Sequence, residues 1–133
     1  MGSFYSNKMN KVVEYESLNE CILYFLMELD LEVIRYYVQP VEIEIPYFDE
    51  NFNKRFWKHV PEVLAFRNGS TPQLFQVKEP DNEDSQKKES KKEIIINKYT
   101  NIFALEKGWH YKVVIPKALP TIVITNMYSI KSS

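Results

Sequence analysis

The sequence is poor in the residues that make disulfides and zinc sites. Its 133 residues include one cysteine, Cys21, and two histidines, His59 and His110, which lie far apart in the chain. A single cysteine cannot form an internal disulfide, and these three residues cannot build the cysteine and histidine clusters that bind structural zinc. The sequence therefore predicts a protein of a reducing, intracellular compartment, and we expect a cytoplasmic location.

Long apolar runs and an excess of one charge are also missing. No stretch approaches the roughly 20 apolar residues that cross a bilayer, so we expect no membrane partner. The chain has 17 Lys and Arg against 18 Asp and Glu, which gives a net charge of −1. This balance excludes a bulk electrostatic attraction to nucleic acid, so any DNA-binding surface has to be local.

What is present is enough apolar material for one folded core. Hydrophobic residues make up 44% of the chain and aromatic residues 14%, which is more than a disordered chain carries. A chain of this length is too short for two ordinary domains. We therefore expect a polar arm over residues 1–14 and a single domain over residues 15–133.

The hydrophobic pattern predicts a mixed α+β fold. Ser17 and Glu20 form a capping box that opens a helix reaching about Leu29. The further predicted elements are a strand over residues 33–45 bent at Pro40, strands over 55–67 and 73–78, a helix over 94–107 ended by Gly108, and a strand over 109–115. The first three strands form a meander, and the last strand follows a crossover, so it should run parallel to its neighbour in a mixed sheet.

Two segments have no clear regular structure in the sequence. Residues 79–93 are strongly charged and predict a mobile loop, which contains the basic run Lys87, Lys88, Lys91 and Lys92. Such a run is most simply a solvated linker. The alternative is contact with DNA phosphates, which adds salt-dependent affinity without sequence choice. The tail over residues 117–133 is apolar enough to add a strand or to cover a sheet edge, and both options stay open.

A group of polar side chains suggests phosphodiester chemistry. Gln76 and Lys78 are two residues apart in the third strand, so both point to one face of the sheet. Glu62 shares a face of the second strand with apolar neighbours, where an unpaired charge is costly. Closing the hairpin near Gly69 places Glu62 opposite or diagonal to Gln76 or Lys78. A hard cation between Glu62 and Gln76, beside the lysine, would satisfy all three groups.

Glu20 and His59 receive different predictions. Glu20 stands at the head of a second apolar stripe on the first helix, which is unusual for a merely solvated carboxylate. Its ordinary role is that of a helix cap. His59 precedes Glu62 by three residues, so the alternation of a strand predicts that it faces away from Glu62 and is no ligand. Trp57, His59 and Trp109 are interpreted as core or edge aromatics.

Four segments together resemble a known family. They are Glu16-Ser17-Leu18-Asn19-Glu20, Gln39-Pro40, Val60-Pro61-Glu62-Val63-Leu64 and Phe75-Gln76-Val77-Lys78. Their order and spacing are similar to those of the N-terminal catalytic domain of the TnsA-type transposase endonuclease subunit. The likeness runs from about Glu14 to Ile115. Glu62 stands where that family usually has aspartate.

The resemblance implies a restriction-endonuclease-like, PD-(D/E)XK fold and a Mg²⁺-dependent enzyme that hydrolyses DNA. It assigns the active site to Glu20, Glu62, Gln76 and Lys78. The implied metal ligands are Glu62, Gln76, the backbone carbonyl of Val77 and Glu20, with Mn²⁺ as a substitute for Mg²⁺. Implied partners are DNA, on which the protein would be nucleoid-associated, and another transposition or phage protein.

Two other functions fit the same residues. The first is a non-catalytic module of the nuclease fold that binds DNA or a protein. The second is a Holliday-junction resolvase-like enzyme, which would act as a two-fold dimer. A protein that binds no metal would be the non-catalytic module. The molecular mass in solution would show whether the protein is the dimer that a resolvase-like enzyme requires.

Overall fold

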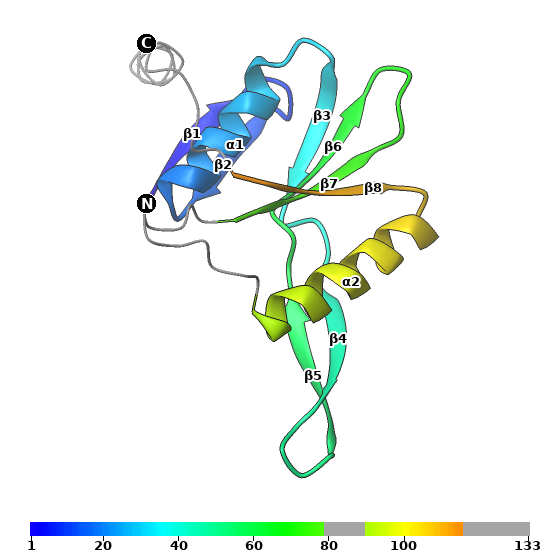
Figure 1. Ribbon diagram of the computed structural model, residues 1–133. Coiled ribbons are helices and arrows are strands. Elements are labelled where there is room, and N and C mark those ends of the chain that lie inside the picture. Colours follow the sequence, from blue (N-terminus) through cyan, green and yellow to red (C-terminus); the bar gives the residue numbers. More distant parts are fainter. Residues whose placement is uncertain (79–89, 116–133) are drawn as a thin grey trace.

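The computed structural model describes residues 1–78 and 90–115 (Figure 1). The elements in these ranges are β1 (Gly2–Ser6), β2 (Lys11–Tyr15), α1 (Leu18–Leu29), β3 (Val33–Val38), β4 (Ile43–Phe48), β5 (Lys54–His59), β6 (Val63–Arg67), β7 (Gln73–Val77), α2 (Lys91–Glu106) and β8 (His110–Val114). The architecture is mixed α+β, as the sequence predicted. None of the described helices is long and apolar enough to cross a membrane.

A four-stranded mixed sheet lies at the centre, with the strand order β3-β6-β7-β8. The pairs β3–β6 and β6–β7 are antiparallel, and β8 is parallel to β7, as expected for a crossover. Alternation along the strands divides the core in two. Val63 and Phe75 pack with α1 on one face, while Leu64 and Leu74 pack with Ala104 of α2 on the other.

The capping box of α1 is confirmed. The Ser17 side chain accepts a hydrogen bond from the backbone N–H of Glu20 at 3.1 Å. The carboxylate of Glu20 accepts in return from the backbone N–H of Glu16 at 3.2 Å, one residue before the partner of a standard box. The buried residues of the helix are Cys21, Ile22, Leu23, Tyr24, Phe25 and Met27.

The two long strands predicted over residues 33–45 and 55–67 are each broken in two. The first break lies at Gln39, whose φ is 47°, and Pro40. The second lies at Pro61, which has no N–H to give to a sheet. The breaks face each other, because the backbone N–H of Gln39 donates to the carbonyl of Glu62 at 2.8 Å. The meander therefore carries an insertion between its first and second strands.

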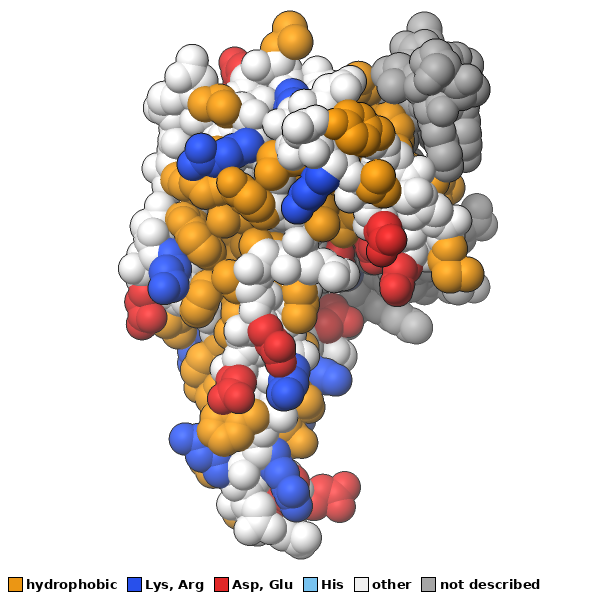
Figure 2. Space-filling model, turned by 180° about the vertical axis from the view of Figure 1, so that it is seen from behind, with side chains coloured by type: hydrophobic (Ala, Val, Ile, Leu, Met, Phe, Trp, Pro, Cys, Tyr) orange, Lys and Arg blue, Asp and Glu red, His pale blue; other side chains and the backbone are white. Residues whose placement is uncertain are grey.

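That insertion is the β4–β5 hairpin, which projects from the body of the molecule (Figure 1). One face packs on α2 through the buried Ile43 and Ile45. The other face is exposed and carries Phe48 and Phe56 beside lysines. From behind, hydrophobic side chains and side chains of both charge signs are interspersed along this projecting part (Figure 2).

The N-terminal residues form a hairpin instead of the polar arm predicted over residues 1–14. Strands β1 and β2 pair antiparallel, and their inward side chains Phe4 and Val13 are buried in the α1 core. Phe4 packs against Phe25 with ring centroids 4.3 Å apart. The prediction failed because the two strands are short and carry few apolar residues, of which Phe4 and Val13 are buried while Tyr5 and Val12 are exposed.

Helix α2 begins at Lys91, so the predicted loop over residues 79–93 is too long. Lys91 and Lys92 lie in the first turn of the helix, which Ser90 caps by accepting from the backbone N–H of Glu93 at 3.2 Å. Ser90 and Glu93 have the spacing of a capping box, which marks this start of the helix in the sequence. Gly108 ends the helix with φ of 76°, as predicted. Residues 79–89, with Lys87 and Lys88, and the tail over 117–133 lie outside the described residues.

One carboxylate fastens the N-terminal hairpin to the rest of the fold. Glu28 accepts hydrogen bonds from the hydroxyls of Ser6 and Tyr36, both at 2.6 Å, and from the backbone N–H groups of Asn7 and Lys8 at 2.9 and 3.1 Å. Burial raises the pKa of Glu28, but these hydrogen bonds outweigh it, so the net pKa lies below its ordinary value. Glu28 thus joins β1, α1 and β3.

We expect Glu28→Ala to lower the free energy of unfolding by about 2 to 3 kcal/mol, because it removes the charged acceptor of the buried Ser6 and Tyr36 hydroxyls. Urea denaturation at neutral pH measures the loss. Glu14→Ala, at an exposed acid on β2, is the matched control and should change stability by less than about 0.5 kcal/mol. Equal stability of the two variants would contradict the role assigned to Glu28.

Candidate active site

Two of the predicted site acids come together through a tyrosine. Glu20 and Tyr24 are one helical turn apart on α1. The hydroxyl of Tyr24 donates to the carboxylate of Glu62 at 3.3 Å, across from α1 to the segment before β6. Glu62 and Glu20 therefore face a common region beside the N-terminal part of α1. Sequence reasoning noted Tyr24 in the second apolar stripe but gave it no role.

The surroundings of Glu62 disfavour the charged form of its carboxylate. Burial raises the pKa of Glu62 to about 7, and the charge of Glu20 adds to the shift. The hydrogen bond from Tyr24 acts in the opposite direction. Burial and the two nearby carboxylates raise the pKa of Tyr24, which stays protonated and remains a donor. Among the described residues, no cation contributes to the pKa of Glu62.

The backbone of Glu62 is bonded to β7 at Phe75. Val63 pairs with Phe75, and the backbone N–H of Glu62 donates to the carbonyl of Phe75 at 2.9 Å. The regular pairing ends at Val63, so Glu62 lies beside Phe75, one residue before Gln76. Its side chain contacts Tyr24 of α1, whereas Gln76 lines a cavity on the side of α2.

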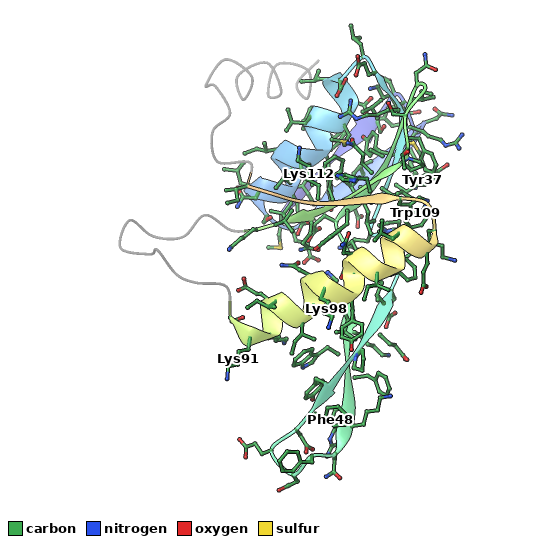
Figure 3. The ribbon with its side chains drawn as sticks, turned by 45° about the vertical axis from the view of Figure 1, so that its right-hand side comes forward. Tyr37, Phe48, Lys91, Lys98, Trp109 and Lys112 are labelled. Carbon is green, nitrogen blue, oxygen red and sulfur yellow. The ribbon has the colours of Figure 1, made fainter. Side chains whose placement is uncertain are left out.

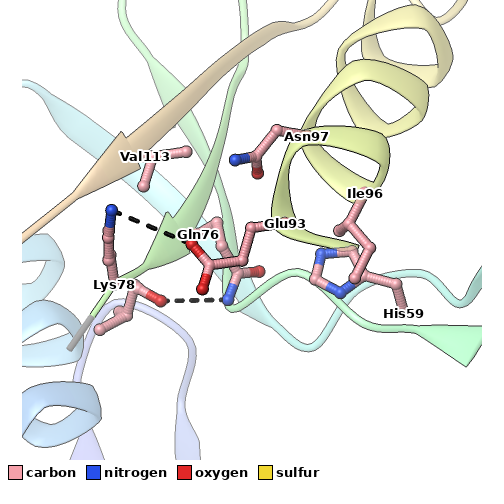
Figure 4. Close-up of a pocket in the computed structure, with 8 residues that line it drawn as sticks. His59, Gln76, Lys78, Glu93, Ile96, Asn97 and Val113 are labelled. Atoms are coloured by element: carbon pink, nitrogen blue, oxygen red, sulfur yellow. Dashed lines mark hydrogen bonds and ion pairs between the residues drawn. The ribbon is translucent and has the colours of Figure 1, made fainter. Parts of the chain in front are cut away.

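Gln76 and Lys78 line a cavity of about 330 Å³ between the sheet, the base of β5 and α2 (Figure 4). The amide nitrogen of Gln76 donates to the carbonyl of Val77 at 3.2 Å, while its buried Oε1 has no hydrogen-bond partner among the described residues. The Lys78 ammonium lies 4.0 Å from the carboxylate of Glu93. Both strand residues point to the same side, as predicted.

His59 lies beside Gln76 and lines the same cavity. Glu62, from which His59 was predicted to face away, is not among the residues that line this cavity. Strand β5 ends at His59 and Pro61 breaks the chain, so strand alternation does not extend from His59 to Glu62. Burial lowers the pKa of His59, and the neighbouring Gln76 amide partly offsets this shift. The imidazole is therefore neutral near pH 7.

The four predicted residues thus form two linked groups. Glu20 approaches Glu62 on one side, and Gln76 and Lys78 share the cavity on the other. The two groups are linked through the backbone, where the N–H of Glu62 is bonded to Phe75 of β7. No hydrogen bond or ion pair connects Glu62 to Lys78 in the described part of the chain. Within residues 1–78 and 90–115, no three acidic, histidine or cysteine side chains converge on one point. The cavity residues that the sequence did not predict are His59, Glu93, Ile96, Asn97 and Val113.

The comparisons with known proteins name no family for this chain. No protein-family model matches it, and no curated protein matches it.

We expect Glu62→Gln to stabilise the protein at about pH 8. A carboxyl whose pKa rises from 4.5 to about 7 on folding binds its proton more tightly in the folded state. The contribution of Glu62 to the free energy of unfolding is therefore greatest below pH 4.5 and falls as the pH rises towards 7. The variant avoids this loss, which we put at about 1 kcal/mol after allowing for the solvent exposure of the carboxylate.

Urea midpoints of wild type and variant at about pH 4 and pH 8 test this expectation. The gain should appear at pH 8 and vanish at pH 4. The control is Glu44→Gln, at an exposed acid on β4, which should change stability equally little at both pH values. A gain of the same size at both pH values would contradict the raised pKa of Glu62.

Proposed function

We propose that the protein is a metal-dependent DNA endonuclease of the PD-(D/E)XK class, similar to the TnsA-type subunit. The observation that carries the proposal is the approach of Glu20 to Glu62, whose backbone N–H is bonded to Phe75 of β7, one residue before Gln76. Glu20, from a different element, reaches the same region beside Tyr24. Four side chains that are scattered in the sequence thus lie near one end of the β6–β7 pair, Glu20 and Glu62 beside α1 and Gln76 and Lys78 in the cavity beside α2.

The residues present fit a hard divalent cation. Glu20 and Glu62 are close enough to repel each other, and a cation between them would relieve this cost. The buried Oε1 of Gln76 has no hydrogen-bond partner within residues 1–78 and 90–115 that meets the usual distance and angle limits, and it is an oxygen ligand of the kind that such a cation takes. Glu62, Gln76, the Val77 carbonyl and Glu20 would hold it. A bound divalent cation polarises a phosphate and lowers the pKa of water.

The other side chains have roles that follow from their surroundings. Tyr24 remains protonated and holds the Glu62 carboxylate in place by hydrogen bonding. Lys78 is fixed by its backbone N–H, which donates to the Val114 carbonyl at 2.9 Å. Its long contact with Glu93 leaves the ammonium able to turn towards a phosphate and stabilise developing negative charge.

The order of elements supports the same proposal. Apart from the β1–β2 and β4–β5 hairpins, the order is a helix, three antiparallel strands, a second helix and a parallel strand, with helices on both faces of the sheet. DNA is the proposed partner. Lys91, at the first turn of α2, and Lys98, further along it, are exposed and available to phosphates (Figure 3). Lys92 lies over the Trp57 ring at 5.1 Å.

A non-catalytic binding module is the second candidate. It is favoured by the absence of a converged cluster of three acidic, histidine or cysteine side chains among the described residues. This module would keep the fold and any DNA contacts of α2 without a metal-dependent activity. Nicking of supercoiled plasmid in the presence of Mg²⁺ or Mn²⁺, absent when the cation is chelated, distinguishes the two functions.

Lys78→Ala should reduce cation-dependent nicking at least about 100-fold while the fold persists, because the backbone bond to Val114 remains. Conversion of supercoiled plasmid to open circles measures the rate, and circular dichroism checks the fold. Lys11→Ala, at an exposed lysine of β2, is the control and should cut at close to the wild-type rate. Near wild-type nicking by Lys78→Ala would refute the site assignment.

Glu20→Gln separates the capping role from the catalytic one. Glutamine can still accept from the Glu16 N–H, so we expect stability to change by less than about 1 kcal/mol. Loss of the charge should slow nicking about 100-fold. Thermal melting and plasmid nicking provide the two readouts, with Glu16→Gln as the control at an exposed neighbour. If both readouts stay at wild-type values, Glu20 is a helix cap only.

A further inference from the structure

The β4–β5 hairpin has a face that points away from α2. The buried Ile43 and Ile45 lie on the face that packs on the helix, so the alternation of the strands turns every second residue to the opposite side. We call these outward residues the outer face. In the register of the hairpin they form three cross-strand rows, which are Glu44 with Lys58, Pro46 with Phe56, and Phe48 with Lys54.

The outer face combines exposed aromatic rings with charged side chains. Phe48 is 69% exposed and Phe56 is 53% exposed. The ammonium of Lys54 lies over the Phe56 ring, 5.5 Å from its centroid. Phe48 lies towards the projecting end of the hairpin (Figure 3). Exposed apolar groups with a charged rim are typical of surfaces that bind another protein.

The charges of the outer face favour a protein over a nucleic acid as its partner. Lys54 and Lys58 are balanced by Glu44 and by the neighbouring Glu42, whose carboxylate lies 3.6 Å from the Lys58 ammonium. Side chains of both charge signs are visible along the same projecting part (Figure 2). A surface without net charge has no general attraction for phosphates. Charges of both signs around apolar groups instead fit a protein surface with the complementary pattern.

The outer face is complementary to a second copy of itself. A two-fold axis parallel to the strands exchanges the places of β4 and β5, so each row meets the same row of the second copy in reverse. The contacts across the axis are Glu44 to Lys58, Phe56 to Pro46 and Phe48 to Lys54, each to the second copy. An axis across the strands would instead set Lys58 against Lys54 of the second copy, and the like charges disfavour that arrangement.

We propose that the outer face docks on the outer face of a second copy of this chain, which gives a two-fold dimer with its axis parallel to the hairpins. The inference goes beyond the proposed nuclease and does not depend on its chemistry, because no candidate site residue belongs to the outer face. Three rows are few against the roughly 20 residues a side of a stable interface. The dimer is therefore weak, with a dissociation constant on the order of 100 µM.

Sedimentation equilibrium of the full chain from about 10 µM to about 1 mM tests the proposal. The wild type should shift from one chain to two over this range. Phe56→Asp should raise the dissociation constant at least about tenfold, because it places a charge at the centre of the contact. Val12→Asp, at a residue of β2 that is 57% exposed, is the matched control and should dimerise like the wild type.

An exchange of charges tests the pairing of Glu44 with Lys58. Glu44→Lys gives this row two lysines and Lys58→Glu gives it two glutamates, so each variant alone repels its own copy. Mixing the two variants restores opposite charges across both contacts of the row. The mixture should form a heterodimer within about tenfold of the wild-type affinity, which also shows that both variants are folded. Lys11→Glu, at an exposed lysine of β2, is the control and should dimerise like the wild type.

Three results would overturn the proposal. They are a wild type that stays monomeric at about 1 mM, a dimer that persists in Phe56→Asp, and a mixture of the two charge variants that does not associate. If the wild type is monomeric and Phe56→Asp, unlike Val12→Asp, weakens binding to duplex DNA, the outer face binds DNA instead of a second copy. Plasmid nicking is measured separately, so failure of the dimer and failure of the proposed function are distinguishable.

Discussion

The backbone of Glu62 is fixed on both sides, and the arrangement of the candidate site depends on this constraint. Its carbonyl accepts from Gln39, and its N–H donates to Phe75. The first bond joins the two chain breaks between which the β4–β5 hairpin projects, and the second bond ties Glu62 to β7. Because the backbone cannot move, the side chain of Glu62 is held against Tyr24 and the charge of Glu20 despite the repulsion.

Two glutamates of this chain have surroundings that shift the pKa in opposite directions. Glu28 has four hydrogen-bond donors around its carboxylate and a pKa below the ordinary value, so its charge is useful to the fold. Glu62 has Tyr24 as its donor, a like charge nearby and a pKa raised to about 7. The fold tolerates that cost at Glu62, and carboxylates with strongly raised pKa values are common at functional sites.

The sequence predicted those parts of the structure that depend on local signals. The capping box at Ser17, the cap at Gly108 and the alternation in β7 each act within a few residues, and all three are found. The placement of His59 depended on a strand that continues past Pro61, and the chain breaks there. The ion pair of Lys78 with Glu93 joins segments that no local pattern relates. Periodicity cannot determine such contacts, because they follow from how separate elements pack.

The two tryptophans of the chain stand at opposite ends of α2. Trp57 stacks on Tyr47 with ring centroids 3.9 Å apart and lies beneath Lys92 in the first turn of the helix. Trp109 follows the last turn, packs edge-on against Phe103 and donates its backbone N–H to Ala104. The chain thus carries its own pair of optical probes, one for each end of α2. Variants that keep a single indole would separate movement of the helix at the cavity end from movement at the far end.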